Sequence, residues 1–135
     1  SPFTPCLSAT SGNATIIFTE TARVVVDDEA LHPGDEIAAV DANGKCVGRL
    51  TWSDTQSEAL TVWEAGLFRT PSPGLQPGDP IALYIWRHAS KRLHTPKNST
   101  LTVQLDASAP YLHDTLRYQR NGMYVIEQLT VRSGL

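Results

Sequence analysis

The chain has 135 residues, of which 41% are hydrophobic and 19% charged, and its formal net charge is −3 at pH 7. This composition is typical of a globular protein and argues against disorder, and the length predicts one domain, residues 1–135. Lys and Arg form no run, and no apolar stretch approaches the roughly 20 residues of a membrane helix. We therefore expect a monomer that binds neither nucleic acid nor a membrane.

Residues 1–12 show no clear periodicity and predict an extended N-terminal arm. The chain begins with Ser1 rather than Met. We therefore expect a domain excised or processed from a longer protein, in which a missing leader says nothing about compartment. Residues 14–19 and 22–26 are rich in β-branched and aromatic side chains, which predicts the first two strands.

The stretch 31–52 predicts a turn, a strand, a second turn and a returning strand. Pro33-Gly34 suits a type II turn, because proline presets φ at the second position and glycine accepts a positive φ at the third. Asn43-Gly44 predicts a two-residue hairpin of type I′, in which both turn residues have positive φ. This unit organises the predicted architecture.

The later elements follow from alternating hydrophobicity and from Gly/Pro clusters. They are strands over 57–64, 81–87 and 101–105, a long loop over 66–78, and a closing hairpin that joins 115–118 to 123–131. No long stretch has the period of a helix. The sequence therefore predicts an all-β fold, a two-sheet antiparallel β-sandwich of the jelly-roll or Ig-like kind, with about 8–10 short strands.

The pattern L-x-P-G-D-x-I-A occurs twice, at 31–38 and at 75–82. In both copies a Pro-Gly turn delivers the chain into a buried strand, which predicts two equivalent corners of the sandwich. Asp35 and Asp79 are expected to accept hydrogen bonds from the turn amides.

The two cysteines, Cys6 and Cys46, allow two interpretations. A disulfide would tie the arm to the returning strand and stabilise the fold by about 4 kcal/mol through the entropy of the unfolded chain. Alternatively, both are buried thiols that behave as small hydrophobic side chains.

Three aromatic side chains are the candidate binding residues. Period-two alternation places Trp63, Tyr84 and Trp86 opposite the aliphatic residues of their strands. Rings on the outer side of one sheet would stack against sugar rings, and Arg87 and Glu64 would fix the orientation of the sugar. In the alternative interpretation the rings face the core or lie under the long loop.

Candidate metal sites are weak. Calcium prefers six to eight oxygen ligands, and the carboxylates near the organising stretch are Asp27, Asp28, Glu29, Asp35, Glu36 and Asp41. A solvated acidic edge explains these residues better, so no cofactor is predicted beyond this possible calcium site. The four histidines are scattered through predicted loops and lack the close spacing of zinc or copper ligands.

Residues 87–97 form the one basic cluster, which would attract an acidic polysaccharide or a neighbouring domain, or would simply be a solvated loop. No G-x-S-x-G motif is present, and no pattern brings two carboxylates to a working distance. We therefore do not expect an enzyme.

The motifs PGDEIAAVDANGKCVGRLTW, LTVW, PGDPIALYIW and RYQRNGMYVIEQLTV resemble a β-sandwich module of large secreted bacterial proteins. The resemblance covers residues 13–131. It implies secretion, a non-catalytic accessory role and neighbouring domains, and it favours the Cys6–Cys46 disulfide.

These observations predict a non-catalytic carbohydrate-binding or accessory module of a secreted bacterial protein, with a polysaccharide and the neighbouring domains as partners. The alternative is a structural spacer or an adhesin-type interaction domain without affinity for saccharides. A small hydrolase or lyase would require a cleft with convergent carboxylates.

Overall fold

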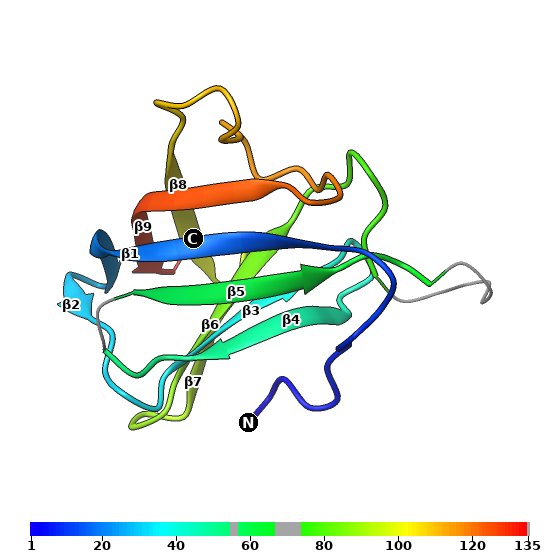
Figure 1. Cartoon of the computed structure of the whole chain (residues 1–135). Helices are drawn as coiled ribbons and strands as arrows, with labels where there is room; N and C mark the ends of the chain where they lie inside the picture. Colours follow the sequence, from blue (N-terminus) through cyan, green and yellow to red (C-terminus); the bar gives the residue numbers. More distant parts are fainter. Residues whose placement is uncertain (55–56, 67–73, 135) are drawn as a thin grey trace.

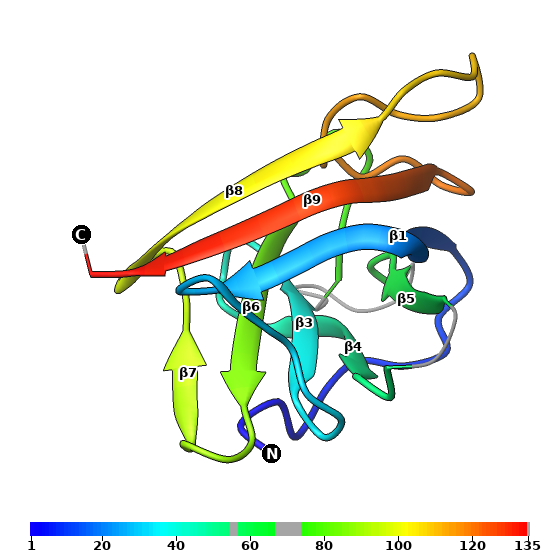
Figure 2. The ribbon, with the colours of Figure 1, turned by 90° about the vertical axis from the view of Figure 1, so that its left-hand side faces the viewer.

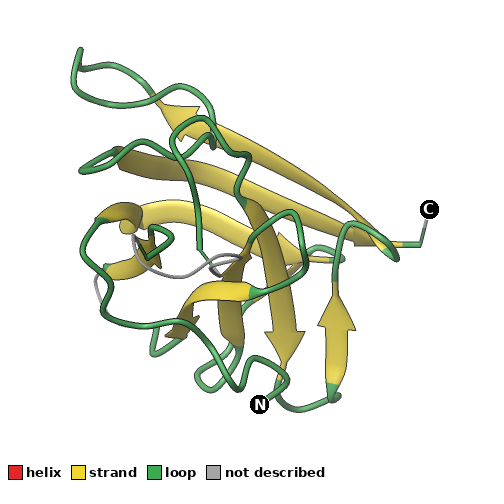
Figure 3. Ribbon diagram, turned by 90° about the vertical axis from the view of Figure 1, so that its right-hand side faces the viewer, coloured by secondary structure: helices red, strands yellow, loops and turns green. Residues whose placement is uncertain are grey.

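The computed structural model describes residues 1–54, 57–66 and 74–134, and in this part of the chain it contains strands and loops but no helix (Figure 3). The strands are β1 (Asn13–Val26), β2 (Glu29–Ala30), β3 (Glu36–Val40), β4 (Cys46–Thr51), β5 (Glu58–Trp63), β6 (Ala82–Arg87), β7 (Arg92–His94), β8 (Ser99–Asp106) and β9 (Met123–Ser133). No helix of the described residues is long and apolar enough to cross a membrane. The predicted all-β sandwich is confirmed.

Two sheets pack face to face (Figures 1 and 2). The first contains β2, β1, β9 and β8 in this order, with β5 paired to the N-terminal half of β1. The second contains β4, β3, β6 and β7. Strand β5 also lies beside β4, so the two sheets meet along this edge.

The core lies between the sheets, and strict alternation builds it. Ile16 on β1, Leu60 on β5 and Ile85 on β6 are all fully buried, while their sequence neighbours face outward. Burying such side chains is the main stabilising term of a sandwich, at about 1.5–3 kcal/mol each. The predicted division of aliphatic and aromatic faces is therefore confirmed for β5 and β6.

The two copies of the repeated pattern form the same corner. Gly34 and Gly78 both have positive φ, at 96° and 90°, as the third residue of a type II turn requires. Asp35 accepts the amide of His32 at 2.9 Å, and Asp79 accepts the amide of Gln76 at 2.9 Å. The predicted aspartate hydrogen bonds are therefore confirmed at both corners.

The β3–β4 connection is not the predicted type I′ turn. Gly44 has φ 77°, but Asn43 is not in the left-handed region. The Asp41 carboxylate accepts the amides of Asn43 and Lys45, and the amide of Gly44 donates to the Asp41 carbonyl. This side-chain hydrogen bonding stabilises the turn without a positive φ at Asn43, and the β3–β4 ladder has a register shift between Ala39 and Val40.

Two other element predictions are wrong in detail. The strands predicted over 14–19 and 22–26 form one long strand, β1, with a register shift between Phe18 and Arg23. The closing hairpin does not form, because β9 pairs parallel to β1 and antiparallel to β8. Residues 115–118 instead bridge to the second Pro-Gly corner, where the amide of Tyr118 donates to the carbonyl of Asp79.

The N-terminal arm lies across the outer face of the second sheet and is fastened at several points. Ser1 Oγ donates to Glu36 at 2.8 Å, and Phe3, which is 5% exposed, packs on Ala38 and Val40. Cys6 forms a disulfide with Cys46, with 4.7 Å between the Cα atoms. Of the two interpretations of the cysteines, the disulfide is confirmed, and the arm is part of the folded domain.

Candidate functional site

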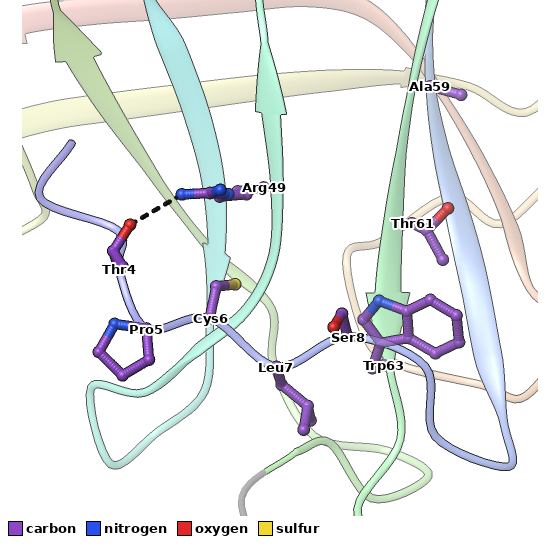
Figure 4. A pocket seen from close by; sticks show the side chains of 9 residues that line it. All are labelled: Thr4, Pro5, Cys6, Leu7, Ser8, Arg49, Ala59, Thr61 and Trp63. Atoms are coloured by element: carbon purple, nitrogen blue, oxygen red, sulfur yellow. Dashed lines mark hydrogen bonds between the residues drawn. The ribbon is translucent and has the colours of Figure 1, made fainter.

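A surface groove of about 530 Å³ lies between the arm and the edge where β4 meets β5 (Figure 4). We call it the Trp63 groove. The residues that line it are Thr4, Pro5, Cys6, Leu7, Ser8, Arg49, Ala59, Thr61 and Trp63. Its volume falls within the roughly 300–1,000 Å³ of small-ligand sites.

Strand β5 supplies one side of the Trp63 groove. Because Leu60 and Val62 are fully buried in the core, Ala59, Thr61 and Trp63 must face outward. The indole of Trp63 is half-buried, with part of its surface open to the groove. An aromatic ring in this position offers an apolar face with polar groups beside it.

Strand β4 and the arm supply the other side. Arg49 is exposed and lies opposite Ala38 in the β3–β4 ladder, which places it on the outer face of the second sheet. Its guanidinium donates a hydrogen bond to Thr4 Oγ1 at 2.9 Å, as Figure 4 shows. The hydroxyls of Thr4, Ser8 and Thr61 are further polar groups at the groove.

The predicted row of three rings does not form. Tyr84 and Trp86 lie on the outer face of β6 in the second sheet, whereas Trp63 belongs to the first sheet through the β1–β5 ladder. Tyr84 and Trp86 are also half-buried, because they pack against the cluster that Phe3 of the arm completes. Period-two alternation assigns a face of a strand, but it cannot assign the sheet or detect a covering arm.

Glu64 does not face the Trp63 groove. It is 6% exposed, and its carboxylate accepts hydrogen bonds from Tyr118 Oη and from Arg120 Nε, both at 3.1 Å. The Arg120 guanidinium holds the pKa of Glu64 below its usual range, against the opposing effect of burial. Burial and the Glu64 carboxylate together raise the pKa of Tyr118. This carboxylate is therefore structural.

Glu64→Gln is expected to lower the free energy of unfolding by about 2 kcal/mol at pH 7, because it removes the charge from hydrogen bonds to a half-exposed Arg120. Since the folded-state pKa of Glu64 is lowered, the stabilisation is fully present above the unfolded-state pKa. It is lost as the pH falls through the folded-state pKa. Urea unfolding at pH 7 and pH 3 should show a difference between variant and wild type that shrinks at pH 3. An equal difference at both pH values would contradict this assignment.

Arg87 is also engaged elsewhere. Its guanidinium pairs with Asp35 at 3.0 Å and with Glu29 at 3.1 Å, so it holds the first Pro-Gly corner against β2. Asp35, which is 2% exposed, additionally accepts the amide of His88 at 2.8 Å. Of the five predicted binding residues, only Trp63 therefore lines the groove.

The acidic residues considered for calcium serve separate local contacts. Asp27 accepts from Ser133, Asp28 pairs with Arg132, and Asp41 caps the β3–β4 turn. In the described ranges no group of three or more His, Cys, Asp or Glu side chains is placed to hold a metal ion. A calcium site finds no support in this arrangement.

The residues that sequence reasoning missed are Arg49 and the arm residues Thr4 and Ser8. The signal for them was the Cys6–Cys46 pair, because a disulfide between these positions brings the arm alongside β4, three residues from Arg49. No family model, curated protein or solved structure matches this chain. The resemblance to secreted bacterial modules therefore stays a prediction.

Proposed function

We propose that this protein is a non-catalytic carbohydrate-binding accessory module of a secreted bacterial protein, and that a polysaccharide binds in the Trp63 groove. The observation that supports the proposal is the partly exposed indole of Trp63 beside hydroxyl groups and a guanidinium in a groove of about 530 Å³. Sugar rings present apolar C–H faces and polar edges. An indole flanked by hydrogen-bonding groups complements both.

The remaining features fit this role. A disulfide persists in oxidising compartments, which supports a secreted protein. Hydrolysis of glycosides commonly requires two carboxylates that face each other across the scissile bond. The described residues that line the groove include no carboxylate, which favours binding over catalysis. Neighbouring domains of the same secreted protein are the further proposed partners.

Trp63→Ala is expected to weaken polysaccharide binding about tenfold, because it removes the apolar platform for the sugar ring. Affinity gel electrophoresis with soluble glucans, xylans and polygalacturonate measures this loss as a change in retardation. Tyr111→Ala is the matched control, because Tyr111 is 70% exposed and does not line the groove. If the Trp63→Ala variant is retarded as strongly as the wild type, the polysaccharide does not bind in the Trp63 groove.

The second candidate is a structural spacer or adhesin-type domain. The observation that favours it is the packing of Tyr84 and Trp86 against the cluster completed by Phe3. Two of the three aromatic candidates therefore contribute to packing in the fold. If no polysaccharide retards the wild-type protein, this second function replaces the first.

A further inference from the structure

The Trp63 groove is lined by one positive charge and by no negative charge among the described residues. The positive charge is the guanidinium of Arg49, which is exposed and makes one hydrogen bond within the described chain, to Thr4 Oγ1. A guanidinium carries five N–H donors, so most of its donors are open to a ligand.

Arg49 differs in this respect from three other arginines of the described chain. Arg87, Arg120 and Arg132 each pair with a carboxylate, and those partners neutralise them. Arg49 forms no such pair in the described residues, although the outer face of the neighbouring strand β3 carries an acidic residue. That acid, Glu36, is 8% exposed, lies one outward position further along β3 and accepts a hydrogen bond from Ser1.

We infer that the groove selects an acidic polysaccharide, in which the carboxylate of a uronic acid residue binds Arg49 while a sugar ring stacks on Trp63. This inference rests on the proposed function and adds the class of ligand. The planar guanidinium fork matches a carboxylate and forms two parallel charge-assisted hydrogen bonds with it. Arg49 and Trp63 lie on opposite sides of the same groove, so one bound segment contacts both (Figure 4).

The geometry also assigns a role to Thr4. Its hydroxyl accepts from Arg49 at 2.9 Å and thereby holds the guanidinium beside the groove. Thr4 is fixed in turn by the arm, two residues from Cys6 and its disulfide. A preorganised guanidinium loses little side-chain entropy when the ligand arrives, which favours affinity.

The test compares polygalacturonate with neutral xylan and with dextran sulfate, by affinity gel electrophoresis and by calorimetry of defined oligosaccharides. Wild-type protein should prefer polygalacturonate, and added salt should weaken that binding. Arg49→Gln should reduce the affinity for polygalacturonate about tenfold to a hundredfold, because charge-assisted hydrogen bonds are lost. Arg49→Lys should restore part of it, since a lysine keeps the charge but not the fork.

Arg23→Gln is the matched control, because Arg23 is exposed on β1, forms no ion pair in the described chain and does not line the groove. It changes the net charge equally and should leave binding unaltered. If neutral xylan or dextran sulfate binds as tightly as polygalacturonate, the inference of a uronic acid ligand is overturned. The proposed function still stands in that case, provided that Trp63→Ala abolishes the binding. An absence of binding to every polysaccharide would overturn the proposed function, and this inference with it.

Discussion

Replacing both cysteines, Cys6→Ser together with Cys46→Ser, is expected to lower the free energy of unfolding by about 4 kcal/mol. The disulfide closes a loop between positions 40 residues apart, and opening it returns that conformational freedom to the unfolded chain. Urea unfolding with and without dithiothreitol measures the effect. The wild-type midpoint should fall to that of the variant on reduction, whereas the variant should not respond to dithiothreitol.

The same variant should lose polysaccharide binding even where it remains folded. Thr4, Leu7 and Ser8 line the groove, and the disulfide to Cys46 is the covalent link that holds this part of the arm beside β4. Release of the arm would also remove Phe3 from Ala38 and expose the rings beneath it. Iodide should then quench the fluorescence of Trp86 more strongly. The contribution of Trp86 is obtained by comparing the quenching with that of the same variant carrying Trp86→Phe. Binding that persists in the reduced protein would show that the arm is dispensable for the site.

Local patterns were sufficient for much of this fold. Alternation in β6 assigns Leu83 and Ile85 to the core, because a half-buried strand must separate its two faces. The Pro-Gly-Asp corners are also encoded locally, since the turn, the positive φ and the aspartate hydrogen bond all involve residues within four positions. These features depend on neighbours in the sequence, so the sequence alone predicts them.

Pairing between distant strands was not predictable in this way. The parallel pairing of β9 with β1 joins residues more than 100 positions apart, and it replaces the predicted hairpin between 115–118 and 123–131. Both arrangements satisfy the same alternation, and packing of the two sheets decides between them. The position of β5 beside β1 follows from the same long-range packing.

The candidate site shows the same division. Trp63 was identified because its outward face is a local property of β5. Arg49 was not, because an isolated exposed arginine has no distinguishing sequence context, and its relevance arises only when the arm is pinned beside it. The structure places Glu64 away from the groove, since its neighbour in the sequence faces the groove while the Glu64 carboxylate accepts a hydrogen bond from Arg120. Groups that converge from three segments require the tertiary structure.

Gly48→Ala is expected to destabilise the fold by about 3 kcal/mol or more, because no space exists for a side chain where β4 meets β5. A Cβ atom at Gly48 would lie 2.1 Å from the carbonyl oxygen of Thr61 and 3.3 Å from the Cα atom of Val62. Both contacts are with backbone, so relief requires the two strands to separate rather than a side chain to rotate. Thermal unfolding and urea titration measure the loss.

Gly44→Ala separates this steric effect from the general cost of replacing a glycine. Gly44 has φ 77°, which costs an alanine about 1 kcal/mol, but a Cβ atom there meets nothing within 4 Å. The Gly48 variant should therefore be clearly less stable than the Gly44 variant. It should also bind polysaccharide more weakly, because separating the strands moves Thr61 and Trp63 away from Arg49. Equal stability of the two variants would mean that β4 and β5 are not in the close contact on which the groove depends.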